Sequence, residues 1–186
     1  MAMPLVAPHY TITDLDRFPD DGNRYELLAG VLLVTPAPGA PHQVALGRLT
    51  MALAQYLGPA GLAVVTTPGV IQSGDDTQLE PDLLVVPARC ADSESWRRMS
   101  DWWLAVEVSG RASRVYDRDF KSGLYLRLGV REVWRVDLRD RTVYVSQRGR
   151  PADVPHTATL TWHPADMATP LRLDLGTVFP PRPPSR

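Results

Sequence analysis

The chain has 186 residues, of which 44% are hydrophobic, and its formal net charge at pH 7 is −1. This composition suits one globular domain with a sizeable core, and no apolar run approaches the ~20 residues that a membrane span requires. The nearly neutral charge is not typical of a dedicated nucleic-acid-binding protein, although a local basic patch can still bind nucleic acid. The first ten residues lack the features of a secretion signal, and a lone cysteine, Cys90, cannot form an internal disulfide. We therefore expect a cytoplasmic protein.

The N-terminal part of the chain predicts a short helix followed by a hairpin. Residues 11–19 have the pattern of a short helix, with Thr13 as its N-cap. Residues 24–36 predict two short strands that are joined by a turn at Ala29 and Gly30. Together these elements place the first strands close to the N-terminus.

The next segment predicts one long helix and further strands. Apolar residues recur at helical spacing over 42–58, and a Gly-Pro pair ends that helix. The β-branched runs 61–72 and 82–86 are typical of strands. The polar segment 73–81 between them predicts a loop.

The second half of the chain adds a buried strand, a helix and a second hairpin. Residues 102–110 are almost continuously apolar, as expected of a strand that is covered on both faces. Residues 113–129 predict a helix that begins at Ser113 and ends before Gly129. The last hairpin is predicted over 132–138 and 142–147.

This order of elements predicts an α/β fold, in which a mixed sheet is flanked by helices. No internal repeat and no linker interrupts the sequence. We therefore expect a single domain over residues 1–180. The proline-rich segment 181–186 is expected to be disordered.

Two carboxylates stand where a charge is costly. Glu107 lies inside the apolar strand, where a carboxylate must be paired, protonated or bound to a cation. Asp82 follows a proline and opens the strand 82–86. For Glu107 the alternative is a structural ion pair with an arginine, and for Asp82 it is the turn chemistry of a Pro-Asp pair.

Lys121 is the only lysine in the sequence. On the predicted helix it lies on the face that packs against the sheet, and the helix follows the strand that carries Glu107. The flexible lysine side chain could therefore bring its ammonium near Glu107. The alternatives are a local ion pair with Asp117 or extension of the side chain into solvent.

Two carboxylates from adjacent strands and a lysine indicate metal-dependent phosphoryl chemistry. Hard carboxylate oxygens bind Mg²⁺ or Mn²⁺, which retains waters and can bind a phosphate oxygen. The metal polarises the phosphoryl group and lowers the pKa of water, while a nearby ammonium can orient that water or stabilise developing charge. We therefore expect a metal site at Asp82 and Glu107.

Several segments, taken in order, resemble the Uma family of restriction endonuclease-like proteins, within the PD-(D/E)XK nuclease superfamily. The resemblance runs from about Tyr10 to Tyr144 and rests on the segments "RYELLAG", "PHQ", "EPDLLVV", "LAVEVSG", "DRDFKSGLYLRLGV" and "EVWRVD". It implies a restriction endonuclease-like core, a four-stranded mixed sheet between helices.

The resemblance also implies roles for individual residues. Asp82 matches the first metal-binding carboxylate and Glu107 the acidic position that follows it. Ser109 stands where the superfamily usually has its lysine, and Lys121 matches a lysine that has migrated to the next helix. Glu26 matches a further acidic position that could help to hold metal or water.

Two further groups of residues are candidates for weaker roles. His42 and Gln43 match a pair at the start of a helix, where a histidine is more often a cap or a surface residue. Arg111, Arg114 and Arg118 are clustered and could contact nucleic acid, although a solvated arginine face is the alternative.

The sequence thus favours an Mg²⁺- or Mn²⁺-dependent endonuclease that hydrolyses DNA and acts as a homodimer, because duplex cleavage needs two sites. DNA is the expected substrate, and the sequence does not exclude RNA. The alternative is a catalytically inactive nuclease-fold module for nucleic-acid binding or dimerisation.

Overall fold

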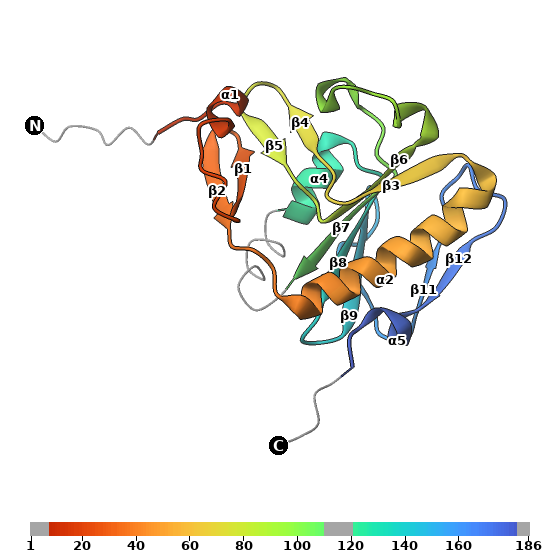
Figure 1. Ribbon diagram of the computed structural model, residues 1–186. Helices are drawn as coiled ribbons and strands as arrows, with labels where there is room; N and C mark the ends of the chain where they lie inside the picture. Colours follow the sequence, from red (N-terminus) through yellow and green to blue (C-terminus); the bar gives the residue numbers. More distant parts are fainter. Residues whose placement is uncertain (1–7, 110–120, 182–186) are drawn as a thin grey trace, which may run out of the picture.

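The computed structural model describes residues 8–109 and 121–181, and its strands form three sheets (Figure 1). The largest sheet has six strands, which are, in spatial order, β10 (Val154–His156), β9 (Thr142–Gln147), β8 (Glu132–Asp137), β7 (Leu104–Ser109), β6 (Leu83–Pro87) and β3 (Ala63–Thr66). The second sheet contains β2 (Val31–Thr35), β1 (Arg24–Leu28), β5 (Thr77–Leu79) and β4 (Ile71–Ser73), and the third pairs β11 (Thr159–Trp162) with β12 (Leu171–Asp174).

Helices α2 (Ala40–Leu57) and α5 (Leu175–Val178) pack on one face of the six-stranded sheet, and α4 (Ser122–Leu128) packs on the other (Figure 1). The short helix α1 (Ile12–Leu15) lies beside β1 of the second sheet. In the six-stranded sheet β7 and β8 are parallel, whereas their neighbours pair antiparallel. This arrangement confirms the predicted α/β class, with a mixed sheet flanked by helices.

Most of the predicted elements are present. The first hairpin turns at Ala29 and Gly30, whose φ angles of 47° and 77° are typical of a tight two-residue turn. Helix α2 ends at Leu57, as predicted, and begins two residues earlier than the predicted segment. Gly129 ends α4 with a φ of 112°, which glycine adopts without strain.

The central strands separate two hydrophobic clusters, because successive side chains of a strand point to opposite faces. On one side Leu83, Val85 and Val106 pack with α2 in one cluster. On the other side Leu84 and Ala105 pack with α4 in a second cluster. Asp82 lies two residues before Leu84, and Glu107 lies two residues after Ala105, so each carboxylate is on the same face of its strand as that neighbour. Both carboxylates therefore point towards α4.

Two predictions of local structure were wrong, and three strands were not predicted. The cap of α1 is Thr11 and not Thr13, because Thr11 and Asp14 form a reciprocal capping box. Segment 73–81 is not only a loop, because it contains β5, which pairs with both β1 and β4. Strands β10 to β12, after residue 150, were not predicted at all.

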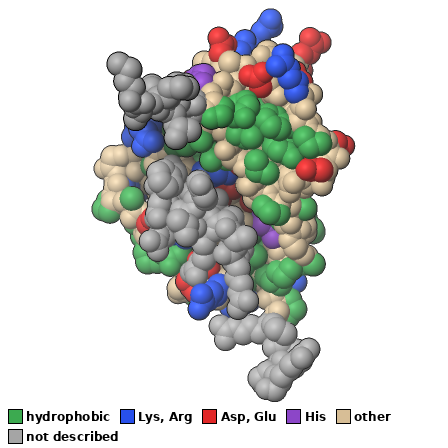
Figure 2. Space-filling model, turned by 90° about the vertical axis from the view of Figure 1, so that its left-hand side faces the viewer, with side chains coloured by type: hydrophobic (Ala, Val, Ile, Leu, Met, Phe, Trp, Pro, Cys, Tyr) green, Lys and Arg blue, Asp and Glu red, His purple; other side chains and the backbone are tan. Residues whose placement is uncertain are grey.

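The side of the molecule that carries β1 and β2 presents a group of hydrophobic side chains in its upper half, and charged side chains gather at its upper edge (Figure 2). Strand β2 is an edge strand, and its residues Val31 and Val34 are 57% and 50% exposed. Within residues 8–109 and 121–181, no helix combines the length and apolar character that a bilayer crossing requires.

Candidate active site

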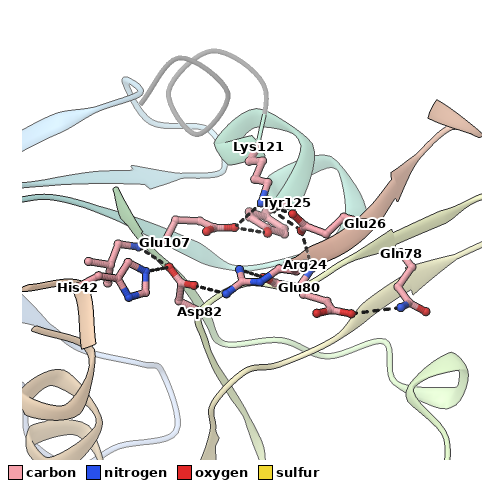
Figure 3. A network of polar contacts seen from close by, with 10 residues as sticks. Arg24, Glu26, His42, Gln78, Glu80, Asp82, Glu107, Lys121 and Tyr125 are labelled. Carbon is pink, nitrogen blue, oxygen red and sulfur yellow. Dashed lines mark hydrogen bonds and ion pairs between the residues drawn. The ribbon is translucent and has the colours of Figure 1, made fainter. Parts of the chain in front are cut away.

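A buried polar cluster lies where the two larger sheets meet α4 (Figure 3). Three of its acidic members come from three strands or their ends: Glu26 from β1, Asp82 from the start of β6, and Glu107 from β7. Lys121 immediately precedes α4. Four residues that are far apart in the sequence are therefore brought together by the packing of the sheets and the helix.

The Lys121 ammonium lies between two carboxylates. Its Nζ is 2.8 Å from Oε2 and 3.0 Å from Oε1 of Glu26, and 3.3 Å from Oε1 of Glu107. The Lys121 side chain is only 7% exposed and that of Glu26 is fully buried. An ion pair so well shielded from water interacts more strongly than one at the surface.

Asp82 has a different set of partners. Arg24 donates to its Oδ1 at 2.8 Å, and the backbone N–H of Val108 donates to its Oδ2 at 2.8 Å. The ring Nε2 of His42 is 2.9 Å from the same Oδ2. Burial acts to raise the pKa of Asp82, but the hydrogen bond from His42, the charge of Arg24 and the Val108 amide together hold that pKa below its ordinary value.

The register of the sheet places Asp82 opposite Glu107. Strands β6 and β7 pair antiparallel with Leu83 opposite Val106, and the same register continued by one residue aligns the two carboxylates. Side chains at opposite positions of an antiparallel pair are close neighbours. Two acidic side chains therefore share one face at the start of β6.

The cluster contains more acidic than basic groups. Among the described residues its carboxylates are those of Glu26, Glu80, Asp82 and Glu107, and its Lys and Arg side chains are Arg24 and Lys121. Burial raises the pKa of Glu80, and the charge of Glu26 raises it further. The charges of Arg24 and Lys121 and a hydrogen bond from Gln78 only partly offset this rise.

Tyr125 and Arg24 also belong to the cluster, although neither was predicted from the sequence. The Tyr125 hydroxyl donates to Oε1 of Glu107 at 2.5 Å, and burial followed by the charge of Glu107 raises the pKa of this tyrosine well above its ordinary value. Both residues could have been found from periodicity. Tyr125 lies four residues after Lys121 on a helix, and Arg24 lies two residues before Glu26 on a strand.

His42 was expected to be a cap or a surface residue, and this expectation was wrong. The residue is only 9% exposed, and it contacts Asp82 from the first turn of α2. Its other ring nitrogen, Nδ1, is buried without a hydrogen-bond partner in the described part of the chain. Gln43, its neighbour in sequence, is exposed.

Some predicted contacts fall on residues outside the described ranges. These are the three arginines Arg111, Arg114 and Arg118, the predicted N-cap Ser113 and the alternative partner Asp117. Their roles stay predictions.

Asp82 and Glu107 are the residues that fit a divalent metal. Their oxygens are hard ligands, they share one face, and the surrounding cluster has an excess of acidic groups. No group of three or more His, Cys, Asp or Glu side chains in the described part of the chain is arranged to hold a metal ion. Mg²⁺ does not require one, because it is commonly held by one or two carboxylates together with waters and substrate phosphates.

Known proteins share this architecture. The crystal structure of a protein from Anabaena variabilis ATCC 29413, described as a putative nuclease belonging to DUF820, matches with a TM-score of 0.72. The two sequences are 16% identical, and the match covers 91% of this chain and 97% of that chain, so the likeness is one of fold. None of the curated proteins matches the sequence significantly. A family model described as "Uma2: Putative restriction endonuclease" matches residues 12–174, which is most of the chain. The chain therefore belongs to the Uma2 family.

Proposed function

We propose that this protein is a divalent-metal-dependent nuclease that hydrolyses phosphodiester bonds of DNA. The family and the structural neighbour support a nuclease-like function. The observation that carries the proposal is the buried Lys121 ammonium, held within 3.3 Å of Glu107 and within 3.0 Å of both oxygens of Glu26. A charged amine can stabilise the charge that develops on a phosphoryl group, and carboxylates can hold a divalent metal beside it.

Asp82 and Glu107 would hold the Mg²⁺ or Mn²⁺ ion. When bound, the ion would polarise the phosphoryl group and favour deprotonation of the attacking water. His42 and the Val108 amide fix the Oδ2 atom of Asp82, and Tyr125 fixes Oε1 of Glu107. These hydrogen bonds orient the two carboxylates before any substrate arrives.

Lys121 acts on the substrate in this proposal, and Glu26 positions Lys121. In the reaction a bond forms between the water oxygen and phosphorus, the bond to the leaving ester oxygen breaks, and the water proton ends on that leaving oxygen. The ammonium can orient the water and stabilise the negative charge that builds on the phosphate oxygens. Glu26, which accepts from Lys121 through both its oxygens, keeps the ammonium in place.

One observation favours a second candidate, a nuclease-fold module without catalysis. Both oxygens of Asp82 already accept hydrogen bonds, from Arg24 on one side and from His42 and Val108 on the other. A carboxylate with these partners can serve as a purely structural ion pair. Such a module would bind nucleic acid or a second subunit without hydrolysing DNA.

Nicking of a supercoiled plasmid tests the proposal. Wild-type protein is expected to nick DNA with Mg²⁺ or Mn²⁺ and not with EDTA, and Lys121→Ala to reduce the rate by about 10²–10³-fold. Arg131→Gln, a half-exposed arginine that pairs with Asp101, is the matched control and should leave the rate unchanged. Equal activity of wild type and Lys121→Ala, each shown to be folded by circular dichroism, would contradict the role of Lys121.

Calorimetric titration with Mn²⁺ separates the two candidates. The nuclease is expected to bind Mn²⁺ and to lose that binding in Asp82→Asn. Absence of binding at millimolar Mn²⁺ supports the module. Parallel assays with single-stranded DNA and RNA define the substrate class.

We also propose that the active form is a homodimer, because cleavage of both strands of a duplex needs two sites. Light scattering at micromolar concentration should give twice the mass of the chain, and a strict monomer contradicts this.

Arg111, Arg114 and Arg118 are the predicted phosphate contacts. Replacement of all three by glutamine should weaken DNA binding and reduce its salt dependence.

A further inference from the structure

Arg24 is the cation that pairs with Asp82. Its Nη2 donates to Oδ1 of Asp82 and its Nη1 donates to the backbone oxygen of Glu80, both at 2.8 Å. The guanidinium group lies between these two acidic residues (Figure 3). A guanidinium carries five N–H donors, and only these two donate in the described part of the chain. Arg24 therefore has donors to spare.

Arg24 also differs from Lys121, the other Lys or Arg side chain of the site, and from the carboxylates that surround it, in its access to solvent, although Glu80 is likewise only partly buried. The Arg24 side chain is 23% exposed, whereas the side chain of Asp82 is 3% exposed and that of Lys121 is 7% exposed. Glu107 and Glu26 are 5% and 0% exposed. Of the two, Arg24 and Lys121, Arg24 is thus the cation that can leave its partner without carrying a buried charge through the core.

Arg24 and a divalent cation are competitors for the same carboxylate. Oδ2 of Asp82 already accepts from His42 and Val108, so Oδ1, the oxygen bound by Arg24, is the more open one. Two positive charges on one carboxylate oxygen repel each other, and the repulsion is strong where water is excluded. When the metal is bound, Arg24 is therefore expected to give up Asp82.

We infer that Arg24 is a phosphate-binding residue of this site: it neutralises Asp82 while the metal is absent, and it binds a phosphate group of the nucleic acid once the metal has replaced it. This inference rests on the proposed function, because it requires both a metal and a nucleic-acid substrate. It adds a residue to the proposed machinery and assigns it the substrate backbone as its ligand.

The chemistry of arginine suits this role. A planar guanidinium donates two parallel hydrogen bonds to a phosphate and stays charged at physiological pH. Burial acts to lower the pKa of Arg24, but the charge and hydrogen bond of Asp82, together with Glu107 and Glu26, hold that pKa above its ordinary value. Because an arginine side chain keeps its charge at physiological pH, Arg24 is a cation both beside Asp82 and beside a phosphate.

Calcium titration by calorimetry is the first arm of the test, because Ca²⁺ binds the same oxygen ligands. Wild type, Arg24→Gln, Arg24→Lys and the remote control Arg131→Gln are compared after thermal denaturation has established that each is folded. Arg24→Gln removes the competitor, so it should bind Ca²⁺ about tenfold more tightly than wild type. Arg24→Lys and Arg131→Gln should stay close to the wild-type affinity.

The second arm measures binding of a short DNA duplex in Ca²⁺ by fluorescence anisotropy, under conditions where intact duplex is recovered. Arg24→Gln should bind more weakly, and the slope of log K against log salt should decrease in magnitude by about 0.9, the loss of one phosphate contact. Arg24→Lys, which keeps the charge, should retain the wild-type slope. It also preserves the test if Arg24→Gln does not fold, because a change of slope in Arg24→Lys would overturn the inference.

The outcomes separate the inference from the proposed function. If Arg24→Gln binds Ca²⁺ more tightly but keeps the wild-type slope of log K against log salt for DNA, the inference is overturned and the nuclease proposal stands. Weaker Ca²⁺ binding by a folded Arg24→Gln has the same consequence. If wild type binds neither Ca²⁺ nor DNA, the proposed function fails, and the inference fails with it.

Discussion

Lys121 and Glu26 form a buried ion pair with 2.8 Å between Nζ and Oε2, although 95 residues separate them along the chain. Removal of the lysine would leave the carboxylate of Glu26 buried and without its cation. Loss of one partner of a buried pair typically costs about 3–5 kcal/mol. We therefore expect Lys121→Met to lower the free energy of unfolding by that amount in urea denaturation.

A double-mutant cycle tests whether this cost belongs to the pair. Glu26→Gln in the Lys121→Met background removes the stranded charge and should restore part of the lost stability. Nicking activity should stay lost in the double variant, because the ammonium is still absent. Simple addition of the two single losses in stability would show that the pair contributes no coupling.

The hydrogen bond from Tyr125 to Glu107 gives a second prediction. Tyr125→Phe deletes only the hydroxyl that donates to Oε1 of Glu107, and it leaves a buried acceptor without this donor. The expected loss of stability is about 1–3 kcal/mol in urea denaturation. Nicking should slow by about 10–100-fold, because the residue orients a proposed metal ligand.

Tyr56→Phe is the matched control for Tyr125→Phe. The Tyr56 hydroxyl donates to the backbone oxygen of Thr169 at 2.6 Å in an exposed hydrogen bond, which water can replace. This control should lose less stability than Tyr125→Phe and should keep full nicking activity. Equal losses in the two variants would argue against a role for Tyr125 in orienting Glu107.

Much of the fold was predictable because its strongest elements are locally specified. The turn at Ala29 and Gly30 and the buried strand β7 each carry a signal within a few residues. Strand β5 does not, because it has only three residues and two of them are polar, and its pairing with β1 and β4 stabilises it. Strand β11 alternates exposed and buried residues as a strand should, but four residues are too few for the pattern to stand out.

The site was predictable only in part, for a similar reason. Glu107 stands out because it is a charge inside an apolar strand, and Lys121 because it is the only lysine. The pairing of Asp82 with Arg24 and His42 joins residues 58 and 40 positions apart, which no local pattern indicates. Such contacts follow from how the sheets pack against α2 and α4.

Helix α2 offers a test of the core on one side of the sheet. Leu53 is fully buried among the hydrophobic residues of that core, so Leu53→Ala should lower the free energy of unfolding by about 2–5 kcal/mol. Met51, two residues earlier on the same helix, is 63% exposed. Met51→Ala should therefore change the free energy of unfolding by no more than about 0.5 kcal/mol. Similar losses for both variants would contradict the orientation of α2.

Glu132 makes the stability of the protein depend on pH. Burial raises the pKa of this carboxyl above its ordinary value of 4.5, and hydrogen bonds from Trp134 and Gln147 only partly offset the effect. At pH values between 4.5 and the raised pKa, Glu132 keeps its proton in the folded protein but has released it in the unfolded chain. The contribution of Glu132 to stability is therefore greatest at low pH and is lost as the pH rises through this window.

Glu132→Gln abolishes this titration. Urea denaturation of both proteins at about pH 4 and about pH 7 gives the difference in the free energy of unfolding between the variant and wild type. Relative to wild type, Glu132→Gln should become more stable as the pH rises, whatever the difference in the free energy of unfolding is at low pH. A difference that is independent of pH would show that Glu132 titrates alike in the folded and unfolded chain.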